Sequence, residues 1–346
     1  MSPRVEHART LSAELARLDD ESVLEIVRDA TPVGVGIGGS TKTARLADSA
    51  VFIKQLPLTK IEESDPTSTV SRLQLPFVSH YGIGCPSQGV GGELAAHRLT
   101  TEWVVNGDAE FFPILLGSRI IEVPCESDLS EFEGGASVRQ WGARWPEVAQ
   151  RLRVMKDASK SMVLFLEYVL ETLGERLRSS LADGGAPAVF ARAVEQIIES
   201  TDWMRSKGFQ HFDVHPGNIL VLEDSLLLTD FGLSLSRGFN LTVEERAELP
   251  VHDEFDRDSA LMHLFQWTLY ELGFVSSAAR LEVLRAASGT PHAPVLDRVR
   301  EALAGASDVL TQYASAALYM TEMFSVLSKD AAGAQYEALA ARNHRC

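Results

Sequence analysis

The chain has 346 residues, 45% of them hydrophobic, which is enough to fill the core of one large domain or two ordinary ones. Its 48 Asp and Glu outnumber 32 Lys and Arg, and the net charge of −16 argues against nucleic acid and membrane surfaces as partners, because both repel an acidic protein. No apolar run is long enough to span a bilayer, no signal-peptide pattern is present, and Cys85, Cys125 and Cys346 lack metal-ligand or redox spacing, so we expect a cytoplasmic protein.

Residues 8–28 predict two short helices. Apolar residues recur three or four positions apart on both sides of an acidic break at 19–21, namely Leu11, Leu15, Leu18, Val23, Leu24 and Val27. We assign residues 1–30 to an N-terminal helical extension that packs against the outside of the following segment, and we expect no catalytic role for it.

A glycine-rich segment, Val-Gly-Val-Gly-Ile-Gly-Gly-Ser-Thr-Lys at 33–42, precedes strand-like runs at 43–46 and 51–54. Two strands joined by a glycine turn allow backbone N–H groups to approach phosphate oxygens, because no Cβ stands in the way. The candidate nucleotide-binding residues of this turn are Gly34, Gly36, Gly38, Gly39 and Ser40. Lys42 leaves a second interpretation open, since nucleotide-binding loops of another fold also carry such a lysine.

The stretch 55–92 has no hydrophobic period and is interrupted by prolines and glycines. An insert of this length is generally functional or mobile. Its Tyr-Gly-Ile-Gly-Cys run at 81–85 is compatible with a turn, a lid or a loop that docks a partner protein, and the residues do not decide among them. A helix then opens after the glycines at 91–92 and continues to 105.

The remaining strands of a predicted five-stranded sheet come from apolar runs at 111–116 with 120–123, and at 161–169. The chain after them is mostly helical in its periodicity, in segments 170–180, 189–207, 281–287, 295–303 and 313–327. Fold class is therefore mixed, with strands gathered in the first half and helices in the second.

The most informative stretch is His-Phe-Asp-Val-His-Pro-Gly-Asn at 211–218, followed by Asp-Phe-Gly at 230–232. Two apolar runs between the motifs predict a β-hairpin, which brings Asn218 and Asp230 near each other at its base. Two oxygen ligands there suit Mg²⁺, which takes few protein ligands and completes its shell with water and phosphate oxygens. Asp213 is then placed to meet a substrate hydroxyl.

In order and spacing, these motifs resemble the catalytic loop and metal-binding loop of protein-kinase-like phosphotransferases. The resemblance implies an α+β, bilobal fold: a lobe at 31–167 with a small antiparallel β-sheet, an αC helix and the 55–92 insert, and a mainly helical lobe at 168–346. ATP and Mg²⁺ would bind between them. His215 stands where a typical protein kinase has Lys, and the Asp-x-His-Pro-Gly-Asn form looks more like aminoglycoside and choline kinases.

The resemblance also implies roles for residues of the first lobe. Lys54, at the end of an apolar strand, would hold the α- and β-phosphates, and an acidic residue of the following helix would pair with it. Glu93 and Glu102 are the candidates; nine residues apart, they face opposite sides of a helix, and we favour Glu93 because more helix follows it. Backbone groups from Glu167 to Val169 would contact the adenine.

The implied catalytic set is Asp213, Lys54, Glu93, His211 and His215, with Asn218 and Asp230 as the Mg²⁺ ligands. Asp213 would orient the acceptor hydroxyl and accept its proton, whereas His211 would brace the loop. A helix that opens near Asp256-Arg-Asp258 resembles the helix whose Asp supports the catalytic loop in this family; Asp256 fits that register and Asp258 is the second choice.

Three functions remain as alternatives. The first is ATP-dependent phosphorylation of Ser or Thr in a protein or peptide, which includes a precursor peptide in natural-product modification. The second, suggested by His215 and the acidic surface, is phosphorylation of a small cationic molecule such as an aminoglycoside. The third is a noncatalytic binding module of the same fold, against which the intact Lys54, Asp213, Asn218 and Asp230 argue. The 55–92 insert is also a candidate docking surface for a partner protein.

Overall fold

The computed structural model describes residues 2–82, 84–290 and 292–337, so Cys346 lies outside the described residues. The chain divides into two compact units. Unit 1 contains the described parts of 1–169 together with 230–246, and unit 2 contains those of 170–229 and 247–346. The N-terminal helices and the Asp-Phe-Gly motif at 230–232 therefore both belong to unit 1.

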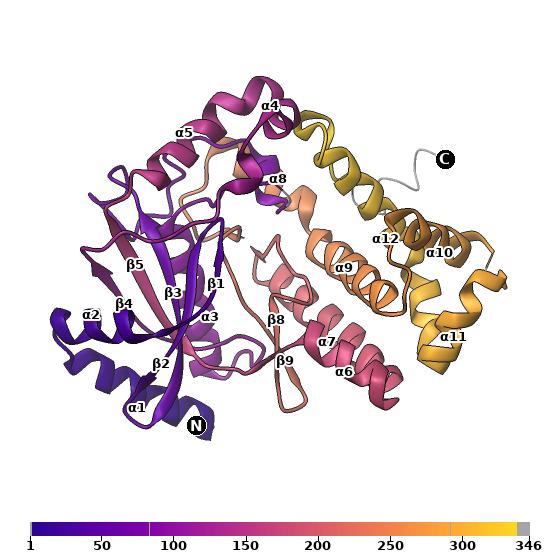
Figure 1. Cartoon of the computed structure of the whole chain (residues 1–346), viewed down its shortest axis with the longest axis horizontal. Helices are drawn as coiled ribbons and strands as arrows, with labels where there is room; N and C mark the ends of the chain where they lie inside the picture. Colours follow the sequence, from indigo (N-terminus) through magenta and orange to yellow (C-terminus); the bar gives the residue numbers. More distant parts are fainter. Residues whose placement is uncertain (1, 83, 291, 338–346) are drawn as a thin grey trace. The chain divides into compact units, whose positions relative to one another are not determined.

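Unit 1 is built on a five-stranded antiparallel sheet, as predicted, and its strand order is β1-β2-β3-β5-β4 (Figure 1). The strands are β1 (Thr31–Gly36), β2 (Gly39–Leu46), β3 (Ser49–Leu58), β4 (Leu115–Ile121) and β5 (Lys160–Glu167). One boundary was wrong: the predicted strand at 111–116 begins only at Leu115. Phe112 before it is fully buried and packs its ring against Trp103 and Phe231.

Two short helices precede the sheet, as predicted. They are α1 (Pro3–Arg17), capped by Ser2, and α2 (Asp20–Asp29), capped by Asp19. Helix α1 packs against β4, and α2 packs against β2. The other long helices of unit 1 are α3 (Val90–Asn106), α4 (Gly135–Trp141) and α5 (Trp145–Lys156).

The insert is fastened to unit 1 by polar contacts. It begins after Leu58, where β3 ends, and includes the short helix η1 (Phe77–His80). Glu62 accepts hydrogen bonds from Val90 N–H at the start of α3 and from Arg151. The His80 ring lies 2.7 Å from the Leu233 carbonyl, after the Asp-Phe-Gly motif, in the segment that continues through β10 (Leu235–Ser236) to α8 (Val243–Glu248). Residue 83 of the 81–85 run lies outside the described residues.

Unit 2 is mainly helical. Its helices are α6 (Leu173–Asp183), α7 (Ala186–Ser206), α9 (Phe255–Glu271), α10 (Ser277–Gly289), α11 (Asp297–Leu303) and α12 (Ser307–Leu327). The predicted hairpin is confirmed as β8 (Ile219–Leu222) and β9 (Ser225–Leu228), with β6 (Glu171–Thr172) paired to β8 and β7 (Phe209–Gln210) preceding the catalytic loop. Short 3-10 turns lie at Ser130–Phe132 and Gly142–Arg144 in unit 1, and at Leu249–His252, Pro294–Leu296, Ala304–Ala306 and Ala331–Gly333 in unit 2.

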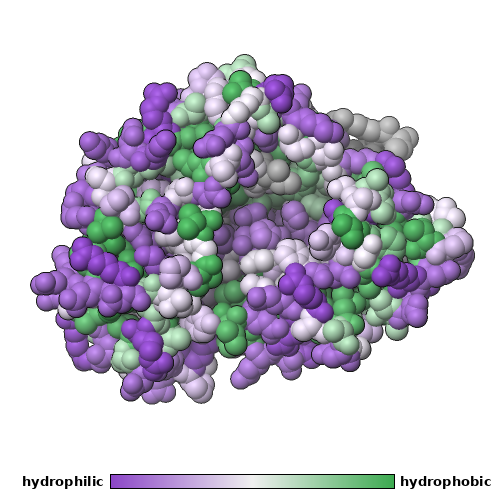
Figure 2. Space-filling model, viewed as in Figure 1, coloured by the Kyte–Doolittle hydropathy of each residue, from purple (hydrophilic) through white to green (hydrophobic). Residues whose placement is uncertain are grey.

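Hydrophilic residues cover most of the face shown in Figure 2, and hydrophobic residues appear there in small separate groups. Large exposed apolar side chains such as Leu170 and Val243 are scattered along the sequence. Isolated residues of this kind are ordinary on protein surfaces. Within the described ranges, no helix is both long enough and apolar enough to cross a membrane.

Candidate active site

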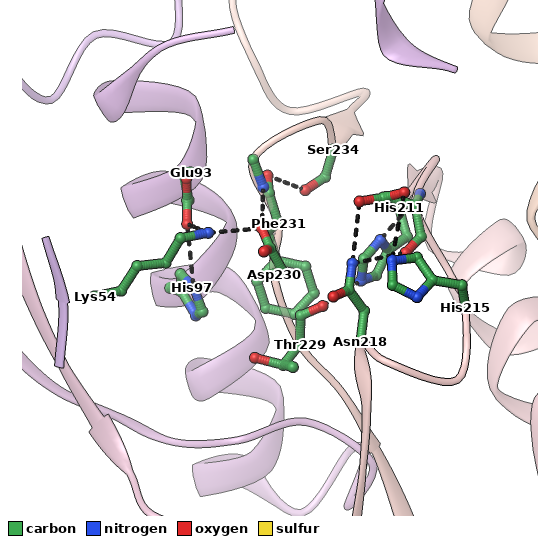
Figure 3. A network of polar contacts seen from close by, with 12 residues as sticks. Lys54, Glu93, His97, His211, His215, Asn218, Thr229, Asp230, Phe231 and Ser234 are labelled. Carbon is green, nitrogen blue, oxygen red and sulfur yellow. Dashed lines mark hydrogen bonds and ion pairs between the residues drawn. The ribbon is translucent and has the colours of Figure 1, made fainter. Parts of the chain in front are cut away.

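Lys54 lies on β3 between two carboxylates of unit 1 (Figure 3). Its Nζ is 2.6 Å from Glu93 Oε1 and 2.6 Å from Asp230 Oδ1, and its side chain is only 9% exposed. Burial lowers the pKa of Lys54, but the charges of Asp230 and Glu93 outweigh burial and raise this pKa above its ordinary value. Lys54 is therefore a cation throughout the physiological pH range.

The packing of α3 decides between Glu93 and Glu102. Val90 and Leu94 belong to the apolar cluster in which α3 meets the sheet, so the neighbouring Glu93 is turned toward Lys54 and is 2% exposed. Glu102 lies on the exposed side of the same helix. A buried ion pair requires close contact to offset the lost hydration of both charges, and the Lys54–Glu93 distance provides it.

The Asp-Phe-Gly motif places Asp230 beside Lys54 through the burial of its phenylalanine. Phe231 is fully buried, and its ring centroid lies 4.7 Å from that of His97 on α3 and 6.0 Å from that of Phe112. Asp230 itself has a φ of 68°, a left-handed conformation that residues other than glycine seldom adopt. Its side chain remains 42% exposed, so the carboxylate can contact both Lys54 and a ligand.

The glycine turn offers an exposed backbone edge. Strand β1, which carries Gly34 and Gly36, is exposed along its whole length. Gly39 needs to be glycine, because its φ is +140° and a Cβ there would lie 2.1 Å from the Gln55 carbonyl oxygen. The turn therefore keeps a close approach to β3, the strand that carries Lys54.

Three residues near the glycine turn contact other parts of unit 1, namely Ser40, Gly38 and Lys42. Ser40 is 6% exposed, and its Oγ lies 3.7 Å from Cys125 Sγ, so this hydroxyl is not presented to a ligand. Gly38 lies over the Ser87 side chain. Lys42 donates to the Val27 carbonyl at the end of α2, so one of its three donors is used within the protein.

The end of β5 lies at a suitable spacing from Lys54 for a nucleotide. Lys54 is paired with Leu164, and Val51 is paired with Glu167. The two pairs are three residue positions apart, which is about 10 Å along the sheet. This is the scale of a nucleoside with its first phosphates. The Glu167 backbone N–H is already used, because it donates to the Ile114 carbonyl at 2.9 Å.

In unit 2, Asp256 at the start of α9 holds the backbone of the 211–218 segment. Its Oδ2 accepts from His211 N–H at 2.7 Å, and its Oδ1 accepts from Phe212 N–H at 2.7 Å. Burial raises the pKa of Asp256 to about 6, although these two N–H donors oppose the shift. Asp258, the second choice, instead accepts a hydrogen bond from the Tyr336 hydroxyl.

Asp213 is oriented by hydrogen bonds with His211 and Asn218, the two partners labelled in Figure 3. The Asp213 N–H donates to His211 Nδ1, so the proton of this ring is on Nε2, which donates to the Thr229 carbonyl at 3.0 Å. With both nitrogens used and no exposure, His211 braces the loop. Asn218 Nδ2 donates to Asp213 Oδ2 at 3.0 Å and to the Asp213 carbonyl at 3.1 Å.

His215 faces Asp213 through an N–H group. Its Nδ1 accepts from Gly217 N–H at 3.1 Å, which leaves the proton on Nε2, 4.0 Å from Asp213 Oδ1. Behind it, the ring of His263 on α9 lies 5.8 Å away, and burial lowers the pKa of His263 to about 3. His263 is therefore neutral and supports His215 by packing.

Each unit carries an oxygen donor of a kind that Mg²⁺ accepts. Asp230 offers a half-exposed carboxylate, and Asn218 uses its amide nitrogen on Asp213, which turns its amide oxygen away from that residue. A carboxylate and an amide oxygen are the hard donors that Mg²⁺ prefers, with water and phosphate oxygens in the remaining positions. Lys54 supplies the cation that a bound phosphate would require.

No protein-family model matches the chain. Parts of it are similar to plant protein kinases. CBL-interacting protein kinase 5 of Oryza sativa subsp. japonica is 40% identical over 94 residues, which are 26% of this chain and 19% of the rice protein. CBL-interacting protein kinase 20 of the same plant is 32% identical over 31% of this chain and 24% of its own length. CBL-interacting serine/threonine-protein kinase 16 of Arabidopsis thaliana is 38% identical over 26% of this chain and 19% of its own length. The chain thus spans a quarter or less of these relatives, and the likeness is a partial, protein-kinase-like one.

Several residues of the site were missed by the sequence analysis. His97 contacts both Glu93 and Phe231, and its only signal was the spacing of four residues from Glu93 on one helix. His263 and Arg4, which contacts Glu167, carried no local signal at all. Their roles depend on packing between segments far apart in the sequence.

Proposed function

We propose that the protein is an ATP- and Mg²⁺-dependent phosphotransferase that moves the γ-phosphoryl group of ATP to a Ser or Thr hydroxyl of a protein or peptide. The observation that carries the proposal is the buried contact of Lys54 with both Glu93 and Asp230. An ammonium shared by a helix carboxylate and an Asp-Phe-Gly carboxylate has little value for stability, because both ions lose hydration. It has a clear use in positioning phosphates.

In the proposed reaction, both units act on one nucleotide within a bilobal kinase-like fold. Lys54 and the backbone of the glycine turn would hold the phosphates, while Asn218 and Asp230 would hold Mg²⁺. The bound metal would offset the charge that develops on the phosphoryl oxygens. The acceptor oxygen bonds to the γ-phosphorus as the bond to the bridging oxygen of ADP breaks. The carboxylate of Asp213, oriented by Asn218, takes the hydroxyl proton.

A labelled-phosphate experiment tests this proposal. The purified chain is incubated with γ-labelled ATP and Mg²⁺, alone and with cell extract, and label on macromolecules is separated from label on small molecules. We expect label on a protein or peptide, and a strongly reduced rate of labelling with Asp213→Asn. Nucleotide binding without transfer to any acceptor would instead favour a noncatalytic binding module, and absence of nucleotide binding would refute the kinase proposal.

A small cationic acceptor is the second candidate. It is favoured by His215, which presents Nε2–H toward Asp213 in place of the Lys of a typical protein kinase. The net charge of −16 would also attract a polycation. Label that appears on an aminoglycoside added to the same assay, and not on macromolecules, would establish this alternative.

A further inference from the structure

We infer that Arg4, in the first turn of α1, is a positioning residue for the nucleotide base, because it holds Glu167 at the end of β5. The inference rests on the proposed function and extends it to a helix outside the kinase-like motifs. The sequence alone indicated only an outer, noncatalytic helix at this place.

The guanidinium of Arg4 donates four hydrogen bonds. Its Nε donates to Glu167 Oε1 at 2.8 Å and its Nη2 to Glu167 Oε2 at 2.8 Å, a two-point pairing with fixed geometry. Its Nη1 donates to the Glu110 carbonyl at 2.9 Å, and its Nη2 also donates to the Phe112 carbonyl. The Arg4 and Glu167 side chains are 19% and 17% exposed, so solvent competes little with this pairing.

Glu167 is held at three points by this arrangement. Besides Arg4, its Oε2 accepts from Ile114 N–H at 3.1 Å, and its own N–H donates to the Ile114 carbonyl. The Glu167 carboxylate therefore fixes the end of β5, and it thereby positions the backbone that continues to Val169. This is the segment that lies about 10 Å along the sheet from Lys54, where the base of a nucleotide would lie.

Attachment of α1 to the sheet does not by itself explain the contacts of Arg4. The other end of α1 is fastened without it, because Arg119 on β4 donates to the Leu15 carbonyl at 3.0 Å. Leu15 also packs so closely on Gly117 that a Cβ there would lie 2.8 Å from its side chain. At the opposite end of α1, Arg4 makes a two-point side-chain pairing with Glu167, in addition to its contacts with the Glu110 and Phe112 carbonyls.

Calorimetric titration of the full chain with Mg-ATP and with Mg-tripolyphosphate tests the inference. Tripolyphosphate lacks the base, so it reports on the phosphate contacts alone. Arg4→Lys keeps the charge but cannot make the two-point pairing. We expect it to raise the Kd for Mg-ATP about 10-fold and to leave the Kd for Mg-tripolyphosphate within about 2-fold. Arg17→Ala is the matched control, since Arg17 makes an exposed pair with Glu14 on the same helix, and it should change neither value.

A second variant, Glu167→Gln, removes the other half of the pairing. We expect it to raise the Kd for Mg-ATP as much as Arg4→Lys does. The double variant should have the same Kd as either single variant, because the same contact is lost in all three. Circular dichroism confirms that each variant is folded. An unchanged Kd for Mg-ATP in folded Arg4→Lys, or an equal loss for both ligands, overturns the role of Arg4. Failure of the wild-type chain to bind either ligand overturns the proposed function itself, and the inference with it.

Discussion

Lys54 Nζ and Asp230 Oδ1 lie 2.6 Å apart, although 176 positions separate the two residues in the chain. Glu93 lies at the same distance from this ammonium, so one cation faces two carboxylates. The cluster carries surplus negative charge, which a divalent cation on the exposed Asp230 would offset.

Replacement of Lys54 separates stability from activity. Lys54→Met leaves Glu93 buried without its cation, which should lower the free energy of unfolding by about 3–5 kcal/mol and abolish phosphoryl transfer. The double variant Lys54→Met/Glu93→Gln should regain most of that stability but no activity. Urea unfolding and the labelled-ATP assay measure the two effects. Lys42→Met, beside the glycine turn, is the control; a similar loss of activity there would shift the phosphate role from Lys54 to Lys42.

Asp213→Asn should lower kcat by roughly 10²- to 10⁴-fold, because the amide cannot accept the hydroxyl proton. Folding should be intact, since the side chain is partly exposed and Asn can still accept from Asn218. Steady-state kinetics with unfolding curves measure both. Asp224→Asn, at the exposed tip of the nearby hairpin, is the matched control. Full turnover by Asp213→Asn would remove this carboxylate from the mechanism.

The buried carboxyl of Asp256 predicts a specific pH dependence. Its pKa is raised from 3.8 to about 6, so the folded state binds this proton more tightly than the unfolded chain does. The associated stability is complete below pH 4 and is lost as the pH rises through about 6, a fall of about 3 kcal/mol at most. The measurement is the free energy of unfolding of the wild type minus that of Asp256→Asn, from pH 4 to 7. A difference that rises with pH would contradict the sign of the shift.

Gly39→Ala should destabilise the protein by more than about 2 kcal/mol, because the residue has a left-handed φ and its Cβ would meet the Gln55 carbonyl. Gly36→Ala should cost less than about 1 kcal/mol, since a Cβ at Gly36 meets nothing within 4 Å. Thermal unfolding of both variants makes the comparison. If Gly39→Ala destabilises the protein no more than Gly36→Ala does, the turn accommodates the added Cβ and does not hold β2 against β3.

Local sequence patterns were sufficient for the secondary structure around the site. Two apolar runs separated by residues 223–225 predicted the hairpin that became β8 and β9, and helical spacing broken at 19–21 predicted α1 and α2. Such patterns express side-chain periodicity and turn chemistry, which act over a few residues. The order of the motifs at 211–218 and 230–232 likewise indicated the chemistry without any tertiary contact.

Choices between similar residues were decided only by the tertiary structure. Glu93 and Glu102 occupy one helix, and only the packing of that helix on the sheet turns Glu93 toward Lys54. The pairing of Arg4 with Glu167 joins residues 163 positions apart. Burial and distance of this kind depend on how whole elements pack, and no short stretch of sequence contains that information.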